Sequence, residues 1–551
     1  MKKVLVITLV MLMVLSIALT GCAPKQGGTT PGNNGGGSGT AVEPQELTIN
    51  LFQEGETYNW PRASSSNSAM VYNWTMEGLT RTTPNGQVTP GIAEKWDISP
   101  DGMTWTFHLR DAKWSDGQPV TAKDFKYSWM KAIDPKEPHD YTYFLYDIQG
   151  AEDYSNGKTT ADKVGINVLD DKTIEVKLEH PVTYFDYLVS FMTYAPIRQD
   201  VYEKYGENFN AEAQYFVTDG PFTVKSWQHE AEMVFVKNPD YWDAANIKLE
   251  KVTGVMIADD QTEFNMYEAG ELDHTIQLTA EQKQAMTKGN VQTFSDGSVW
   301  FLAFNLNDPV LKNVNIRKAL TYAIDRDSFI KNVAKQPWKP ALAFIQPDVI
   351  PGEDGKTPWR DTVPSYFKDN DIETAKQLLA QGMKELGITS IPKMKFMCND
   401  NAAYQSYCQA IQEMWKKNLN VEVEIEPVPS AVRIDRVQKH DYDLAYFGWG
   451  PDYPDPMTDL DLFVTGGGNN YSDYKNPEYD NLIKSAKAEP DRAKKYVLMR
   501  KAEDLLMQDM VIGPIAFRYK DYAVREYVKN FERGPFLDTQ FIYSSIEGKS
   551  K

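Results

Sequence analysis

The chain has 551 residues, of which 42% are hydrophobic and 12% aromatic, so it is long and apolar enough for two or three domains. It carries 58 basic against 77 acidic residues, a formal net charge of −19. So acidic a chain lacks the basic surface that a phosphate backbone requires, and we expect no nucleic-acid partner.

The first residues have the pattern of a secretion signal. Lys2 and Lys3 precede an apolar run over residues 4–19, which is shorter than the roughly 20 residues needed to span a bilayer. Small residues then lead to Cys22, an ending that resembles the bacterial lipobox, in which the cysteine becomes a lipidated N-terminus. We therefore expect a lipoprotein signal peptide over residues 1–21 and a lipid on Cys22. The alternative is an ordinary cleaved signal with an incidental cysteine.

A polar stretch follows the cysteine. Residues 25–45 are rich in Gly, Thr, Asn and Pro and contain almost no large apolar side chain. Such a composition cannot bury enough surface to offset its ordering entropy, so residues 22–45 are predicted to form a flexible tether. About 20 residues of this kind span roughly 25 Å. The protein is then held at the outer face of the cell membrane, or on the periplasmic side where two membranes are present.

The body of the chain alternates predicted strands and helices. Apolar and polar residues alternate over residues 103–110, 173–178 and 421–426, which is typical of strands with one buried face. Apolar residues recur at helical spacing over residues 315–330, 402–419 and 493–510. Mixed elements in this order predict an α/β protein with more than one lobe.

Two further cysteines lie in predicted apolar surroundings. Cys398 ends an apolar stretch, and Cys408 falls on the apolar face of the helix predicted over residues 402–419. This placement favours two buried thiols, with a disulfide as the alternative.

The usual signatures of enzymes are missing. The glycine run at residues 466–468 continues without the lysine of a phosphate loop, and no Gly-x-Ser-x-Gly elbow occurs. The six histidines never pair at helical spacing. These absences favour a protein with no metal and no cofactor. A hydrolase built on two carboxylates stays open, because the separation of acids in space is not visible in a sequence.

Four closely spaced motifs resemble the signature of the family 5 extracellular solute-binding proteins. They are AEKW at residues 93–96, SPDG at 99–102, WTFHLR at 105–110 and KWSDGQPVTAKDF at 113–125. Further matches follow in the family's order at residues 77–79, 219–222, 238–242, 304–306, 315–326, 415–419 and 442–445. Members of this family are the oligopeptide-, dipeptide- and nickel-binding components of ABC importers.

The resemblance implies a two-lobed α/β clamp of the periplasmic-binding-protein type, with an additional inserted domain, that closes around its ligand by a hinge. On this reading lobe I combines residues 46–81, 196–295 and 514–551. The inserted domain II is residues 82–195, and lobe III is residues 296–513.

Within the family, residues 448–456 (GWGPDYPDP) look most like the oligopeptide-binding branch. There a Gly-Trp-x-x-Asp-Tyr element lines the cleft, and the resemblance assigns Asp452 to the ligand's α-ammonium. A carboxylate is a suitable partner because a buried cation must be paired. The resemblance also assigns a pocket wall to Trp449 and backbone hydrogen bonds to Gly450. The alternative for Asp452 is a loop aspartate that caps its own backbone.

The chain departs from this branch where the ligand's carboxylate is expected to bind. Similar proteins place a basic residue shortly before the Gly-Trp element, and this chain has Tyr446 there. Arg433 and Arg436 are nearby, but neither can be aligned with that position. Tyr141 matches a cleft tyrosine of the smaller lobe, with core packing as an almost equal alternative. Residues 64–67 fall near the family's first-lobe ligand contact, with a poor local match.

We expect from this resemblance a monomeric, non-enzymatic protein that captures oligopeptides and delivers them to the permease subunits of an ABC transporter. Within the family, a dipeptide, a nickel complex or a signalling peptide is the alternative ligand. The alternative of another class is a secreted carbohydrate-binding protein or glycosidase, suggested by the 13 tryptophans and 30 tyrosines.

Overall fold

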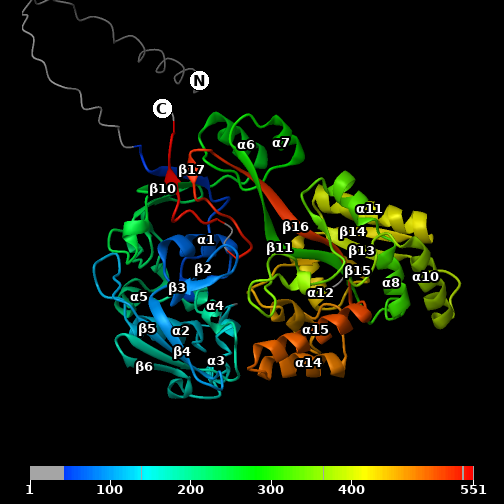
Figure 1. Cartoon of the computed structure of the whole chain (residues 1–551), viewed down its shortest axis with the longest axis horizontal. Helices are drawn as coiled ribbons and strands as arrows, with labels where there is room; N and C mark the ends of the chain where they lie inside the picture. Colours follow the sequence, from blue (N-terminus) through cyan, green and yellow to red (C-terminus); the bar gives the residue numbers. More distant parts are fainter. Residues whose placement is uncertain (1–42, 138, 140, 364, 537–538, 550–551) are drawn as a thin grey trace, which may run out of the picture. The chain divides into compact units, whose positions relative to one another are not determined.

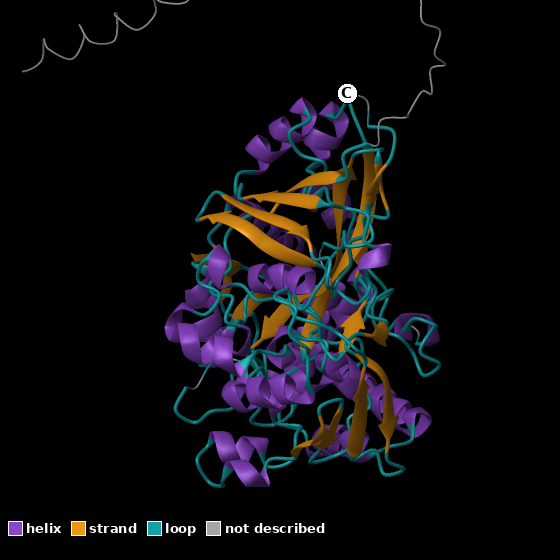
Figure 2. Cartoon of the chain, turned by 90° about the vertical axis from the view of Figure 1, so that its left-hand side faces the viewer, coloured by secondary structure: helices purple, strands orange, loops and turns teal. Residues whose placement is uncertain are grey.

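The computed structural model describes residues 43–551, except residues 138, 140, 364, 537–538 and 550–551. The predicted signal peptide, Cys22 and nearly all of the predicted tether lie outside the described residues. The described chain contains three large sheets (Figure 1), with helices flanking the strands (Figure 2). No helix of this described part is long and apolar enough to cross a membrane.

The core around the first sheet joins the two ends of the described chain. The strand order of this sheet is β1 (Glu46–Asn50), β10 (Lys251–Val255), β9 (Glu232–Lys237) and β8 (Phe222–Gln228), with β1 parallel to β10 and the other pairs antiparallel. Trp74 of helix α1 (Ser66–Thr75) is fully buried in the same core, where its ring lies 4.5 Å from that of Phe541. Gln45 also donates a hydrogen bond to the backbone oxygen of Ile546 at 2.9 Å. Segments almost 500 residues apart therefore complete one core.

The second sheet lies wholly within residues 82–195. Its order is β4 (Ala93–Ile98), β5 (Thr104–Leu109), β7 (Thr173–Lys177) and β6 (Ile166–Asp170), all antiparallel. The strands predicted over residues 103–110 and 173–178 are confirmed as β5 and β7, and burial alternates along β5 as the pattern predicts. Helix α2 (Ala122–Ala132) begins after a capping box formed by Thr121 and Asp124.

The third sheet has six strands in the order β12 (Lys339–Pro340), β16 (Ile512–Val524), β11 (Asn290–Phe304), β15 (Leu444–Trp449), β13 (Met394–Asn399) and β14 (Val423–Val428). Strand β14 confirms the predicted strand over residues 421–426, shifted by two residues toward the C-terminus. Helices α10 (Ile372–Leu386), α11 (Ala402–Leu419), α14 (Pro477–Ala488) and α15 (Arg492–Gln508) contribute buried residues to the core of this sheet.

Two of the three predicted helices are confirmed, as α11 and α15. The prediction of one continuous helix over residues 315–330 is wrong, because helix α8 (Val314–Tyr322) ends at Tyr322 and Asp325 caps a new helix, α9 (Arg326–Phe329). Asp325 has extended backbone angles, and its carboxylate accepts a hydrogen bond from the amide of Ser328 at 2.9 Å. An aspartate in this capping geometry interrupts the helical hydrogen bonds although the apolar spacing continues past it.

Both internal cysteines are buried. Cys398 lies on β13 and Cys408 on α11, and each is 0% exposed with a free thiol. The prediction of two buried thiols rather than a disulfide is therefore confirmed.

Two long antiparallel strands, β11 and β16, pass from one hydrophobic core to another. In Figure 1 the green β11 and the red β16 run side by side toward β15. Residues 522 and 524 of β16 pack in the core of the first sheet, whereas residues 299–304 of β11 pack in the core of the third. Their register is irregular between Ser295 and Val299. The predicted lobe boundaries at residues 295 and 513 both fall inside these paired strands.

Candidate functional site

The loop that carries the predicted anchor begins at the end of β15. This strand lies between β11, to which it is antiparallel, and β13, to which it is parallel. Its residues 444–447 are buried, and the ladder with β11 ends where Trp449 pairs with Val299. A Cβ atom on Gly448 would lie 2.5 Å from the indole of Trp300, so only glycine lets this tryptophan pack on the strand. The sheet therefore fixes the position from which residues 450–456 depart.

Asp452 is a half-buried residue of this loop. Its amide donates to the hydroxyl of Thr458 at 2.9 Å, which fixes the loop, but its carboxylate has no hydrogen bond or ion pair with another described residue. Burial raises the pKa of Asp452 to about 6. The alternative prediction was that the Asp452 carboxylate caps the backbone of its own loop. In the structure Asp455 makes such a cap instead, because its carboxylate accepts from the amide of Met457 at 2.9 Å.

The charge of Asp452 acts on three tyrosines. Tyr143 and Tyr187 come from residues 82–195, and Tyr471 comes from the chain that follows β15. Burial raises the pKa of each phenol, and the negative charge of Asp452 raises it further. The carboxylate is therefore close enough to act electrostatically both on residues 82–195 and on the chain that follows β15. Sequence analysis did not find these tyrosines, although it assigned Tyr141, two residues before Tyr143, to the cleft.

Direct contacts join residues 82–195 to the same loop. The ring of Tyr184 stacks on that of Tyr453, with centroids 4.1 Å apart and planes 11° apart. Lys495 of α15 donates to the hydroxyl of Thr183 at 2.7 Å and pairs with Asp455 at 3.0 Å, and Lys495 is only 3% exposed. A cavity of about 590 Å³ lies beside these contacts and is lined in part by Thr183, Tyr184, Tyr187, Pro454 and Asp455.

Trp449 and Gly450 lie at the end of the strand. Trp449 is half-buried, and its indole nitrogen is buried with no hydrogen-bond partner among the described residues. Gly450 is exposed and lies beyond the β11 ladder, where the nearest atom to an added Cβ would be that of Ser298 at 3.9 Å. The main chain at Gly450 is therefore accessible for pairing with another strand.

Tyr446 and Tyr141 lie in aromatic clusters. Tyr446 is 0% exposed, its ring centroid lies 5.0 Å from that of Trp300, and its hydroxyl is buried without a described partner. Tyr141 is half-buried and its ring lies 4.9 Å from that of Phe144 and 5.9 Å from that of Tyr143. The structure thus places Tyr446 inside the core behind β15, and Tyr141 behind the more exposed Tyr143.

The first-lobe segment at residues 64–67 is held by Glu56. Its carboxylate accepts from the amides of Ser64 and Ser65 at 2.6 and 2.9 Å and from the hydroxyl of Ser68 at 2.8 Å. Burial acts to raise the pKa of Glu56, but these hydrogen bonds outweigh it and lower the pKa to about 2. The serines therefore form the start of α1, which Ser65 also caps.

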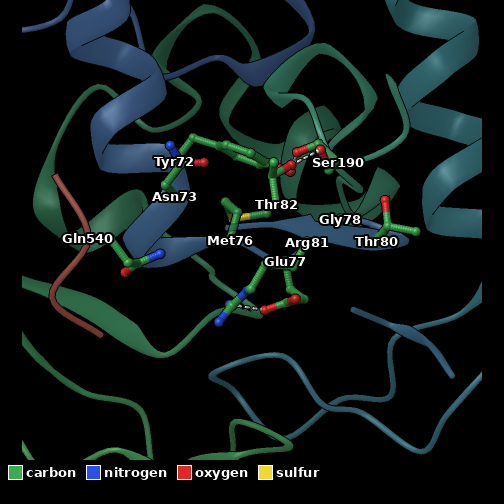
Figure 3. A pocket seen from close by; sticks show the side chains of 10 residues that line it. All are labelled: Tyr72, Asn73, Met76, Glu77, Gly78, Thr80, Arg81, Thr82, Ser190 and Gln540. Atoms are coloured by element: carbon green, nitrogen blue, oxygen red, sulfur yellow. Dashed lines mark hydrogen bonds and ion pairs between the residues drawn. The ribbon is translucent and has the colours of Figure 1, made fainter. Parts of the chain in front are cut away.

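A separate hollow of about 20 Å³ beside α1 and β2 (Thr80–Thr82) is a structural feature. Figure 3 shows Glu77 paired with Arg81 in this hollow, and Thr82 bonded to Ser190 at 2.6 Å. The hydroxyl of Tyr241 also donates to Glu77 at 2.8 Å. The volume holds about one water molecule, so we assign no ligand to it.

Comparisons with known proteins agree with the sequence resemblance. Residues 87–471 match the family described as "Bacterial extracellular solute-binding proteins, family 5 Middle". The oligopeptide-binding protein OppA of Bacillus subtilis is 39% identical over 95% of this chain and 96% of its own length. The dipeptide-binding protein DppE of the same organism is 35% identical over 95% of each chain.

A solved structure extends the likeness to the fold. The structure of Listeria monocytogenes OppA bound to peptide is similar with a TM-score of 0.73 and 32% identity, covering 91% of this chain and 99% of that one. These matches confirm the predicted resemblance and the predicted two-lobed α/β fold. The chain belongs to family 5 of the bacterial extracellular solute-binding proteins.

Proposed function

We propose that this protein captures peptides beside the loop after β15 and delivers them to an ABC importer. The observation that carries the proposal is the Asp452 carboxylate, which is half-buried and unpaired among the described residues. A desolvated carboxylate without a partner costs free energy, which the α-ammonium of a peptide recovers by a charge-assisted hydrogen bond. The peptide bound to Listeria OppA and the name of the B. subtilis relative support this ligand class.

The other predicted contacts have complementary roles in this proposal. The exposed main chain at Gly450 pairs with an extended peptide as an added strand, and the indole of Trp449 forms the wall of a side-chain pocket. The ring of Tyr141 packs against that of Tyr143, which is 52% exposed and whose pKa the charge of Asp452 raises. Water in a cavity of about 590 Å³ next to this loop accommodates side chains of different size.

Ligand capture is coupled to a hinge in this proposal. Residues 82–195 contact the loop through Tyr184 and Thr183, whereas β11 and β16 are continuous between the two cores. Bending at the irregular register near Ser295 opens and closes the contacts without breaking the strands. The protein binds and releases its ligand unchanged, as expected of a solute-binding component, and performs no chemistry on it.

We also propose that a lipid on Cys22 holds the monomeric protein at the membrane, close to its permease subunits. The charged start, the apolar run and the small residues before Cys22 support this anchor. Cys22→Ser should move the protein from the membrane fraction to the soluble fraction. Retention of the variant in the membrane fraction would contradict the anchor.

Native mass spectrometry of the purified protein tests the proposed ligand class. We expect the folded protein to carry additional mass that denaturation releases as short peptides, which can be sequenced. Calorimetry with defined peptides should then show one binding site. A protein that carries no peptide and gives no heat with any member of a peptide library would not be a peptide-binding protein. Release of sugar from a polysaccharide would instead support the carbohydrate alternative.

A further inference from the structure

A cavity of about 720 Å³ lies beside the short antiparallel pair of strands β17 (Val528–Lys529) and β18 (Ser545–Ile546). Its volume is within the roughly 300–1,000 Å³ of ordinary ligand sites. Figure 1 shows β17 well apart from β15, so this cavity is not part of the proposed peptide site. The charged residues that line it are four cations, Lys288, Arg525, Lys529 and Lys549, and two exposed glutamates, Glu526 and Glu547.

Three of these four cations have no ion pair with another described residue. Lys288 and Lys529 are exposed, and each donates to a backbone oxygen, at 3.4 and 2.5 Å. Only Lys549 is paired, with Asp273 at 3.3 Å. The cavity therefore has an excess of positive charge, although the whole chain has a formal net charge of −19.

Arg525 is the buried cation of this group. It is 5% exposed, its guanidinium lies 4.2 Å from the ring centroid of Tyr267, and its Nη2 donates to the backbone oxygen of the same tyrosine. Its Nε is buried with no hydrogen-bond partner in the described part of the chain. A buried donor without an acceptor costs free energy. An anionic ligand in the cavity would supply both the missing acceptor and the missing charge.

The cavity also lies where the described chain begins. The carboxylate of Glu43, the first described residue, accepts from the amide of Gly548 at 2.7 Å, and Gly548 lines the cavity. The tether predicted between Cys22 and this point spans roughly 25 Å on average. A lipid on Cys22 would therefore hold this cavity within reach of the membrane surface, where the phosphates of lipid headgroups are the abundant anions.

We propose that this cavity binds the phosphate group of an anionic membrane lipid, an inference that goes beyond peptide capture. Arginine suits phosphate oxygens through its directed donors, and lysine suits them through its compact charge. Basic residues close to an anionic lipid surface each add to the attraction. The bound headgroup fixes which face of the protein is turned toward the membrane, which an anchor on a tether does not do.

Co-sedimentation of the Cys22→Ser protein with lipid vesicles tests this proposal, because the variant keeps the whole chain without a lipid of its own. Vesicles of equimolar phosphatidylglycerol and phosphatidylcholine should bind it about 25-fold more tightly than vesicles of phosphatidylcholine alone. This preference corresponds to roughly fivefold for each of two net positive charges in the cavity. Adding Lys288→Gln and Lys529→Gln removes these two charges and should abolish the preference.

The matched control adds Lys484→Gln and Lys501→Gln instead. These two exposed lysines lie on α14 and α15, so the control loses the same net charge away from the cavity. It should keep the preference for phosphatidylglycerol. Both pairs of substitutions should leave the thermal unfolding temperature and peptide affinity unchanged, so the proposed function stands whichever way the vesicle experiment ends.

Four results would contradict the proposal. Equal binding to both kinds of vesicle, or binding to neither, would show that the cavity does not recognise an anionic headgroup. A preference that survives in the Lys288 and Lys529 variant would place the lipid contact elsewhere. A preference lost equally in the control would reduce the effect to net charge. Heat of binding with inorganic phosphate that only the cavity variant loses, without any vesicle binding, would assign the cavity to free phosphate instead of a lipid.

Discussion

Two carboxylates in the third-sheet region differ in whether the protein supplies them with a partner. Glu503 of α15 is 0% exposed and accepts from both Nη atoms of Arg360 at 2.8 Å each and from the indole of Trp359 at 2.8 Å. Asp452 is half-buried and accepts from no described residue. Burial is thus common to both, and the difference is whether the fold itself supplies the partner. The first carboxylate stabilises the protein, and the second is available to a ligand.

This difference has an energetic consequence. The unpaired Asp452 destabilises the ligand-free protein, because its charged form is desolvated without compensation. The same free energy is recovered when a cation binds. Binding sites commonly trade stability for affinity in this way.

The largest expected effect comes from removing the partner that Glu503 provides. Glu503→Gln leaves the Arg360 guanidinium buried without a counter-charge, so the free energy of unfolding should fall by about 3–4 kcal/mol. Urea unfolding followed by tryptophan fluorescence measures the change. Glu373→Gln is the control, because the Glu373 carboxylate is 83% exposed and its loss should have no measurable effect. If the two variants are equally stable, the paired Glu503 does not stabilise the protein, and it does not differ from Asp452 in this respect.

Asp452→Asn should weaken peptide binding and leave the fold intact. We expect the affinity for a free tripeptide to fall about 100-fold, because the buried ammonium loses its counter-charge. The affinity for the N-acetylated tripeptide, which has no ammonium, should not change between the two proteins. Calorimetry with both peptides measures the two effects. The same loss for both peptides would contradict the ammonium anchor.

The raised pKa of Asp452 predicts how pH affects the site. Because its pKa in the folded protein is about 6 against an ordinary 3.8, the folded protein holds the proton more tightly, and stability is lost as pH rises from about 4 to 6. Asp452→Asn should therefore be more stable than the wild type at pH 7 and equally stable at pH 4, as measured by thermal unfolding. Peptide affinity of the wild type should fall below pH 6 by up to about tenfold per pH unit. A wild-type affinity independent of pH between 5 and 7 would contradict this assignment.

The smallest expected effect concerns the contact between residues 82–195 and α15. Thr183→Val removes the hydroxyl that accepts from Lys495, and Lys495 keeps its pair with Asp455. The loss of one such hydrogen bond is worth about 1 kcal/mol, so peptide affinity should fall about fivefold if this contact belongs to the closed form. Thr193→Val is the control, because the buried hydroxyl of Thr193 has no described partner. If the two variants bind the peptide with equal affinity, the hydrogen bond between Thr183 and Lys495 does not contribute to ligand binding.

Local patterns predicted several elements of the fold, but they predicted neither β15, from which the loop with Asp452 departs, nor which side chains meet beside that loop. The apolar spacing predicted both ends of α11, and alternation predicted β5 and β7. The break at Asp325 was missed because apolar spacing continues through it, although the aspartate itself was the signal. The capping alternative at Asp452 could not be decided either, because three aspartates lie within eight residues and Asp455 and Asp452 differ only in what surrounds them.

Two arginines of helix α12 (Ser430–Gln438) also show what a local sequence pattern cannot predict. Arg433 and Arg436 lie on one helix, and only their distances from Glu426 and Asp441 distinguish a paired from an unpaired guanidinium. Tyr143 and Tyr187 feel the charge of Asp452 although they lie more than 250 positions earlier in the chain, and no local pattern predicts such a long-range proximity. Tyr446 is buried because both faces of β15 are covered, so the alternation that would indicate its direction is absent.

The contact between Trp74 and Phe541 determines the order in which the chain can fold. The first core contains residues from β1 and α1 together with Phe541, Ile542 and Ile546, so it cannot close before the last residues have been made. The third-sheet region draws most of its core from the contiguous residues 299–519 and can assemble earlier. The part of the molecule synthesised first is therefore completed last, and Trp74 would report the final step of folding.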